Sequence, residues 1–163
     1  TNAPAFRNIL FRNCDCIHGS TAFLDIQHHN RADIGQVTVE DIRVEYTKHQ
    51  LPDVFQNDMD APYPTDTPVR HPLLFCLPIY RSGLFAEDGL NGQIHDITFR
   101  NIRILTDAPE VPVPESAFLG LDAEHTVERI CIAGVTCNGK RLATREELRL
   151  HINEFVRDVT ILP

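Results

Sequence analysis

The feature that most constrains the fold of this chain is a phrase of about eleven residues that recurs along it. Two copies are nearly identical: FRNILFRNCDC, which starts at Phe6, and IHDITFRNIRI, which starts at Ile94. Three further copies are IGQVTVEDIRV from Ile34, VERICIAGVTC from Val127 and VRDVTIL from Val156. The starts are 28, 60, 33 and 29 residues apart, so one unit is about twice as long as the others. Self-similarity at such a period indicates a repeat architecture.

Within each copy the apolar residues alternate, which predicts a strand with one buried face, and a central Asn, Asp or Gly predicts a bend. Stacked copies would bury their apolar positions as continuous columns. The first predicted column is Ile9, Val37, Ile97, Ile130 and Val159. The second is Phe11, Val39, Phe99, Ile132 and Ile161, and the bends fall at Asn13, Asp41, Asn101 and Gly134.

A second series of short strands lies between the copies, at residues 22–27, 76–80, 117–122 and 148–153. Alternation in this series predicts an inward column of Leu24, Leu77, Leu119 and Leu150. It also predicts an outward row of polar and aromatic residues, one from each unit: Gln27, Tyr80, Asp122 and Asn153. Such a row, with loops beside it, would form one wall of an elongated cleft.

Three segments, VTVEDIRVEY, IHDITFRNIRI and LGLDAEHTVERICIAGVTCNGKRL, give the chain a family resemblance. It resembles the right-handed parallel β-helix of the pectin-lyase-like group, and most closely the C-terminal coils of polygalacturonase-like proteins of glycoside hydrolase family 28. The resemblance implies an all-β solenoid of about four coils plus a partial fifth. It further implies a single domain over 1–163, with a loop insertion at 47–71, that forms the C-terminal part of a longer protein.

The resemblance implies action on a polysaccharide, but the residues leave the activity open. The family's inverting hydrolases use NTD, DD, GHG and RIK segments, and none of the four occurs here. The first hypothesis is therefore a portion of a polysaccharide-degrading glycoside hydrolase whose catalytic segments lie elsewhere. The alternative is a non-catalytic domain for glycan binding, adhesion or assembly.

Two turns contain the residue types that bind or cleave sugars. In DIQHHNRAD, we expect His28 and His29 to contact substrate unless the segment is simply a solvated turn. In LDAEHTVE, Asp122 and Glu124 are candidates for the acid and base of glycoside hydrolysis, and His125 for substrate contact. Together with Gln27, Tyr80, Asp122 and Asn153, these histidines make up the predicted substrate-binding set.

The formal charge of −8 leaves no basic stripe, so we expect neither a nucleic acid nor a membrane as partner, and neutral glycans fit better than polyanions. Self-association through the open ends of a solenoid is also expected. No cofactor is implied. The long insertion contains Phe55, Met59 and Tyr63, which would either cover sugar faces or pack along the wall.

Three of the five cysteines, Cys14, Cys16 and Cys137, occupy positions that Ile and Val fill in other copies. They are therefore expected to be buried free thiols rather than disulfide partners or metal ligands. Unpaired thiols slightly favour a reducing compartment such as the cytoplasm. The segment from Thr144 to Leu148 has the spacing of a capping box, which predicts the start of a short helix.

Overall fold

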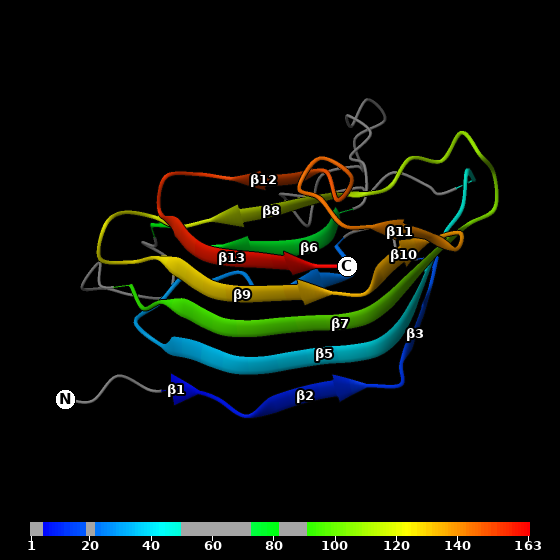
Figure 1. Ribbon diagram of the computed structural model, residues 1–163. Coiled ribbons are helices and arrows are strands. Elements are labelled where there is room, and N and C mark those ends of the chain that lie inside the picture. Colours follow the sequence, from blue (N-terminus) through cyan, green and yellow to red (C-terminus); the bar gives the residue numbers. More distant parts are fainter. Residues whose placement is uncertain (1–4, 19–21, 50–72, 82–90) are drawn as a thin grey trace, which may run out of the picture.

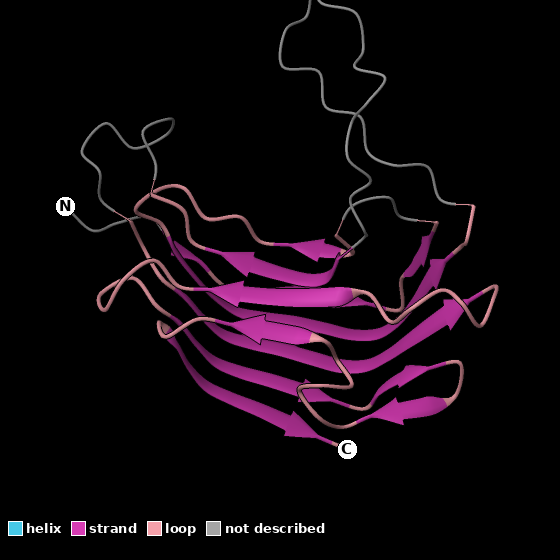
Figure 2. Ribbon diagram, turned by 90° about the horizontal axis from the view of Figure 1, so that it is seen from above, coloured by secondary structure: helices cyan, strands magenta, loops and turns pink. Residues whose placement is uncertain are grey.

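The computed structural model describes residues 5–18, 22–49, 73–81 and 91–163, in which there are thirteen strands and no helix. Figure 1 shows the strands lying side by side, and Figure 2 shows that strands and loops account for the whole described chain. The strands are β1 (Ala5–Phe6), β2 (Ile9–Arg12), β3 (Asp15–Ile17), β4 (Leu24–Asp25), β5 (Asp33–Tyr46), β6 (Leu73–Pro78), β7 (Ile94–Thr106), β8 (Glu115–Leu119), β9 (Val127–Ala133), β10 (Val135–Cys137), β11 (Lys140–Leu142), β12 (Leu150–Ile152) and β13 (Val156–Leu162).

These strands form two sheets. The larger has nine strands, and its core order is β1-β5-β7-β10-β11, with β2 and β3 also paired to β5 and with β9 lying between β7 and β13. The smaller has four strands in the order β12-β8-β6-β4. Every pairing between these strands is parallel except that of β10 with β11, so the larger sheet is mixed.

The predicted right-handed parallel β-helix, with about four coils and a partial fifth, is wrong for this chain. The described strands form a mixed nine-stranded sheet and a separate four-stranded sheet, and not a solenoid. Strand alternation specifies which face is buried and which residues pair, but it does not specify the number of sheets or how the chain passes between them. Mainly parallel sheets are most familiar from α/β proteins, where helices cover them. Here strands dominate, and one hydrophobic core draws on both sheets.

The column prediction for the larger sheet is confirmed residue by residue. Ile9 pairs with Val37, Val37 with Ile97, Ile97 with Ile130, and Ile130 with Val159. The next column pairs with the same register, from Phe11 through Phe99 to Ile161. Phe99 is fully buried and lies between Phe75 of β6 and Phe118 of β8, with ring centroids 3.9 and 6.4 Å away. The columns thus form the core between the sheets.

The predicted bends are also present. Asn13, Asp41, Asn101 and Gly134 all have positive φ, between 54° and 65°. Asn and Asp tolerate this left-handed region better than other residues with a side chain, because their short polar groups bond locally. A second row of left-handed residues was not predicted, and it lies just before β2 or near the start of β5, β7, β9 and β13: Asn8, Gln36, Asp96, Arg129 and Asp158. The first four copies of the phrase therefore bend twice, at the same places, and the fifth bends once.

In the smaller sheet the predicted register is wrong. Leu24 pairs with Phe75, Leu77 with Phe118, and Leu150 with Ser116, so the four leucines do not form one column. A register shift between Leu73 and Cys76 offsets the pairing of β6 with β8. The outward residues predicted from this alignment are accordingly not one row.

The two ends of the larger sheet differ. At its N-terminal edge, strands β1 to β3 expose four large apolar side chains, those of Phe6, Leu10, Phe11 and Ile17. At the other end, β11 folds back antiparallel to cover β10, whereas β13 pairs only with β9 and exposes Leu162. In the interior, Tyr46 at the end of β5 is buried, and its hydroxyl donates a hydrogen bond to the Leu73 carbonyl at 3.3 Å.

The burial prediction for the thiols holds only in part. All five cysteines are free, but Cys14 is exposed, and Cys16 and Cys137 are half-buried. Cys14 lies between β2 and β3, which have a neighbouring strand, β5, on one side only. The Thr144–Leu148 segment forms turns instead of the predicted helix, although Thr144 Oγ1 accepts from the Glu147 N–H at 3.2 Å as a capping box would.

The insertion at 47–71, with Phe55, Met59 and Tyr63, lies outside the described residues beyond position 49.

Candidate functional site

Most of the predicted site residues lie where strands of the smaller sheet end and the chain turns into the larger sheet. We call this region the turn edge, and it comprises residues 27–33, 80–81, 91–96, 120–129 and 153–155. Successive turns are joined by backbone hydrogen bonds, from Tyr80 N–H to the His28 carbonyl at 2.9 Å and from Gly92 N–H to the Asn30 carbonyl at 2.8 Å. The fold therefore brings together turns that are far apart in the sequence.

The exposed aromatic surface of the turn edge is a stacked pair. The rings of His29 and Tyr80 lie 4.8 Å apart with an interplanar angle of 25°. Tyr80 is 42% exposed, at the end of β6. Gln27, also exposed, donates from Nε2 to the Asp25 carboxylate at 2.7 Å. Of the predicted binding residues, His29, Tyr80 and Gln27 are the ones that combine accessibility with this strand end.

His28 is placed differently from its neighbour. Its ring is buried, with Nε2 2.5 Å from the Ala32 carbonyl and Nδ1 3.3 Å from the Asn30 N–H. Because the carbonyl only accepts, Nε2 carries the proton and Nδ1 accepts from Asn30. Burial lowers the pKa of His28, and the Ala32 hydrogen bond opposes that shift only in part. His28 therefore closes its own turn.

The predicted catalytic residues, Asp122 and Glu124, form hydrogen bonds that stabilise their own turn. One oxygen of Asp122 accepts from the N–H groups of Glu124 and His125, each at 3.0 Å, and lies 2.7 Å from His125 Nδ1. Burial raises the pKa of Asp122, but these hydrogen bonds outweigh it, and the net shift is downward. A general acid in glycoside hydrolysis needs a raised pKa. Glu124 is exposed, and its carbonyl accepts from Gln93 Nε2 at 2.9 Å.

The side chain of Asn153 forms hydrogen bonds with the backbone of a neighbouring turn. Its Oδ1 accepts from the Gly120 N–H at 3.1 Å and its Nδ2 donates to the Gly120 carbonyl at 2.7 Å. This side chain joins two turns and is half-buried. It does not extend a polar row beside Tyr80.

His95, which the sequence pattern did not single out, is held between two carboxylates. His95 Nε2 lies 3.0 Å from Asp33 and Nδ1 lies 2.5 Å from Asp96. Each ring nitrogen therefore has a carboxylate oxygen as its hydrogen-bond partner. The ring packs on Gly35, where a Cβ would lie 2.4 Å from it.

Two arginines extend this network across the strands. Arg7 pairs with Asp33, and Arg129 Nε donates to Asp96 at 2.8 Å. These bonds to Arg129, and then the contact with His95, lower the pKa of Asp96 to about 2. The repeat alignment offered a signal for this cluster, because Gly35 and His95 are equivalent positions in neighbouring copies.

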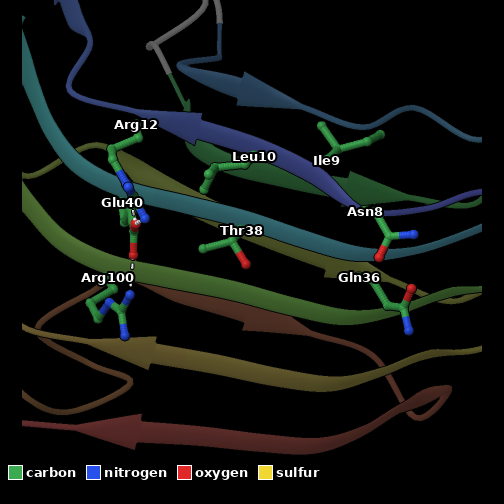
Figure 3. Close-up of a pocket in the computed structure, with 8 residues that line it drawn as sticks. All are labelled: Asn8, Ile9, Leu10, Arg12, Gln36, Thr38, Glu40 and Arg100. Carbon is green, nitrogen blue, oxygen red and sulfur yellow. Dashed lines mark hydrogen bonds and ion pairs between the residues drawn. The ribbon is translucent and has the colours of Figure 1, made fainter.

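A shallow open groove lies on the outer face of the larger sheet, over β2, β5 and β7. We call it the outer groove (Figure 3), and its volume is about 450 Å³. It is lined by Asn8, Ile9, Leu10, Arg12, Gln36, Thr38, Glu40 and Arg100. Glu40 accepts from Arg12 Nε at 2.5 Å and also from Arg100. Hydrogen bonds from Arg100 and then Arg12 lower the pKa of Glu40.

Within the described ranges, no group of three or more His, Cys, Asp or Glu side chains is arranged to hold a metal ion. No helix long and apolar enough to cross a membrane is found in the same ranges. Comparison of the chain with protein-family models, with curated proteins and with solved structures found no match.

Proposed function

We propose that this chain is a carbohydrate-active domain of a protein that degrades polysaccharide, and that its own role is to bind the glycan chain at the turn edge. The observation that carries the proposal is the exposed Tyr80 ring, stacked on His29 at the end of β6. A tyrosine offers a flat apolar face to the C–H groups of a sugar ring and a hydroxyl to its oxygens. The resemblance to polygalacturonase-like sequences supports a polysaccharide as the partner.

The polar groups around this pair fit a neutral sugar. Gln27 and Asp25 form a hydrogen-bonded pair at the end of β4, the strand next to β6 in the sheet, and both side chains are exposed. The Gln27 amide can donate to and accept from sugar hydroxyls, and the Asp25 carboxylate can accept from them. The formal charge of −8 disfavours a polyanionic chain at long range.

Binding is favoured over cleavage because the candidate catalytic carboxylates do not have the required properties. Asp122 has a lowered pKa and three hydrogen bonds within its own turn. The four segments that the resemblance would require for hydrolysis are missing from the sequence. Asp122 and Glu124 therefore have no proposed catalytic role here.

The test is calorimetric titration with neutral oligosaccharides of four to six sugars. Tyr80→Ala should weaken binding about threefold to tenfold, because an aromatic contact contributes about 0.5–1.5 kcal/mol. The matched control is Leu105→Ala, which removes another exposed apolar side chain at the far end of β7. Unchanged affinity in the Tyr80 variant, or equal weakening in both, would contradict the proposal.

A further inference from the structure

We propose that the outer groove is a separate binding site for a small hydroxy acid, an organic acid with a carboxylate at one end and hydroxyl groups along its carbon chain. The inference does not depend on glycan binding at the turn edge. It rests on the way the groove distributes charge, amides and apolar surface along two neighbouring strands.

One end of the groove presents two arginines in fixed positions. Glu40 of β5 has a side chain only 4% exposed, and it pairs with Arg12 of β2 and Arg100 of β7. The arginine side chains are 53% and 55% exposed. A guanidinium has five N–H donors, and each arginine uses only part of its set on Glu40. The remaining donors are held beside the groove by a buried carboxylate, as a preorganised anion site requires.

Two positive and two negative side chains lie at this end of the groove. Arg12 and Arg100 contribute two positive charges against one negative charge on Glu40. The Asp41 carboxylate also acts on Arg100, through a weaker Coulombic interaction, and it accepts from the Asn101 amide at 3.0 Å. A ligand carboxylate can therefore accept hydrogen bonds from both arginines, while the negative charge of Asp41 opposes its binding.

The other end of the groove presents amides. Asn8 and Gln36 lie there, at the left-handed bends that precede β2 and within β5 (Figure 3). Leu10 and Thr38, paired in register, lie between the amides and the arginines (Figure 3). From position 8 to position 12 the strand spans about 13 Å at most.

This order of groups selects the ligand. The planar guanidinium matches a carboxylate in geometry as well as charge. Amide groups both donate to and accept from hydroxyls. Leu10, which is 53% exposed, offers apolar contact to the carbon chain. The volume of about 450 Å³ is that of a small-molecule site. Because the groove is open, we expect a dissociation constant in the millimolar range.

The experiment is an amide NMR titration of the intact chain with gluconate, with sorbitol as the neutral compound of the same carbon number. Gluconate should shift the amides of Leu10, Arg12, Thr38, Glu40 and Arg100 in a saturable way. Sorbitol should bind at least about tenfold more weakly, since it lacks the charged acceptor. Equal binding of the two compounds, or shifts that never saturate, would refute the carboxylate assignment.

Variants locate the site. Arg12→Gln and Arg100→Gln should each weaken gluconate binding about tenfold. Asp41→Asn should strengthen it severalfold, because the opposing negative charge is removed. Asn also tolerates the left-handed backbone at this position, so the bend should be kept. The control is Arg43→Gln, an arginine of the same sheet that pairs with Asp15 and Glu45 outside the groove. Unperturbed spectra away from the substitution confirm folding. Equal weakening in the Arg43 variant, or weakening by Tyr80→Ala, would show that the outer groove is not a distinct site.

Discussion

The first strands of the larger sheet and its central strands repeat the same phrase in different surroundings. Phe11 of β2 and Phe99 of β7 belong to one column, yet Phe11 is 46% exposed and Phe99 is fully buried. Ile9 and Ile97 differ in the same direction. The local sequence fixes which face a side chain takes, whereas burial also needs a neighbouring strand on each side. Equivalent residues should therefore differ widely in what they contribute to stability.

The largest effect should come from Phe99→Ala. Its ring stacks against Phe75 at 3.9 Å and lies near Phe118, so truncation leaves a cavity between the sheets. We expect a loss of about 3–5 kcal/mol in the free energy of unfolding, measured by urea denaturation.

Phe11→Ala is the matched variant on the first strands, and it should cost less than about 1 kcal/mol. Similar losses for the two variants would mean that β2 is covered in solution, and the comparison between the edge and the centre would fail.

A smaller loss is expected from Gly35→Ala. The added Cβ would lie 2.4 Å from the His95 ring, so the ring must move and its bonds to Asp33 and Asp96 must weaken. We expect a cost of about 1–3 kcal/mol. Adding His95→Ala should recover part of it, because the clash disappears.

The comparison for that pair is Arg7→Ala, which removes the ion pair with Asp33 from the same network without adding a clash. If Gly35→Ala costs no more than Arg7→Ala, then the histidine does not occupy the space above the glycine as described.

The smallest effect concerns acid stability. The pKa of Asp96, about 2 in the folded protein, is lower than that of an unfolded aspartate, near 3.9. A depressed pKa contributes stability above the unfolded value, and this contribution is lost as the pH falls from about 4 to about 2. Asp96→Asn should therefore flatten the pH dependence of the melting temperature in that window. Asp96 is 42% exposed, so solvent screening keeps the effect modest.

Asp15→Asn, on β3, tests whether that acid sensitivity belongs to the central strands. An equal flattening by this substitution would locate the sensitivity in the sheet as a whole and not in the Asp96 network.

The sequence predicts the larger sheet well because the repeated phrase indicates both which side chains face the core and which residues pair between strands. Apolar and polar positions alternate, and the left-handed Asn101 and its equivalents mark the same point in each copy. The smaller sheet lacks this information. In β6 (Leu73–Pro78) nearly every residue is buried, so buried and exposed positions do not alternate along the strand. The pairing register of this strand therefore could not be predicted from the sequence. The number of sheets was not encoded in the alternation either, and the family resemblance supplied the wrong answer.

The candidate sites divide in the same way. Arg12, Glu40 and Arg100 are equivalent positions of the aligned phrase, so their contact could have been predicted from the larger sheet. The stacking of His29 on Tyr80 depends on the register of the smaller sheet and could not. The commitment of Asp122 and Asn153 to their own turns depends on hydrogen bonds that residue type alone does not specify.

The buried hydroxyl of Tyr46 gives the protein an optical reporter of its own. The chain has no tryptophan and three tyrosines, so its near-ultraviolet absorbance and emission come mainly from phenol rings. Burial raises the pKa of Tyr46 well above its ordinary value, whereas the ring of Tyr80 is open to solvent. Phenolate formation at Tyr46 therefore has to wait until the contact between the end of β5 and Leu73 opens. In strong alkali, the slow phase of the absorbance change at phenolate wavelengths therefore reports the rate at which the two sheets separate.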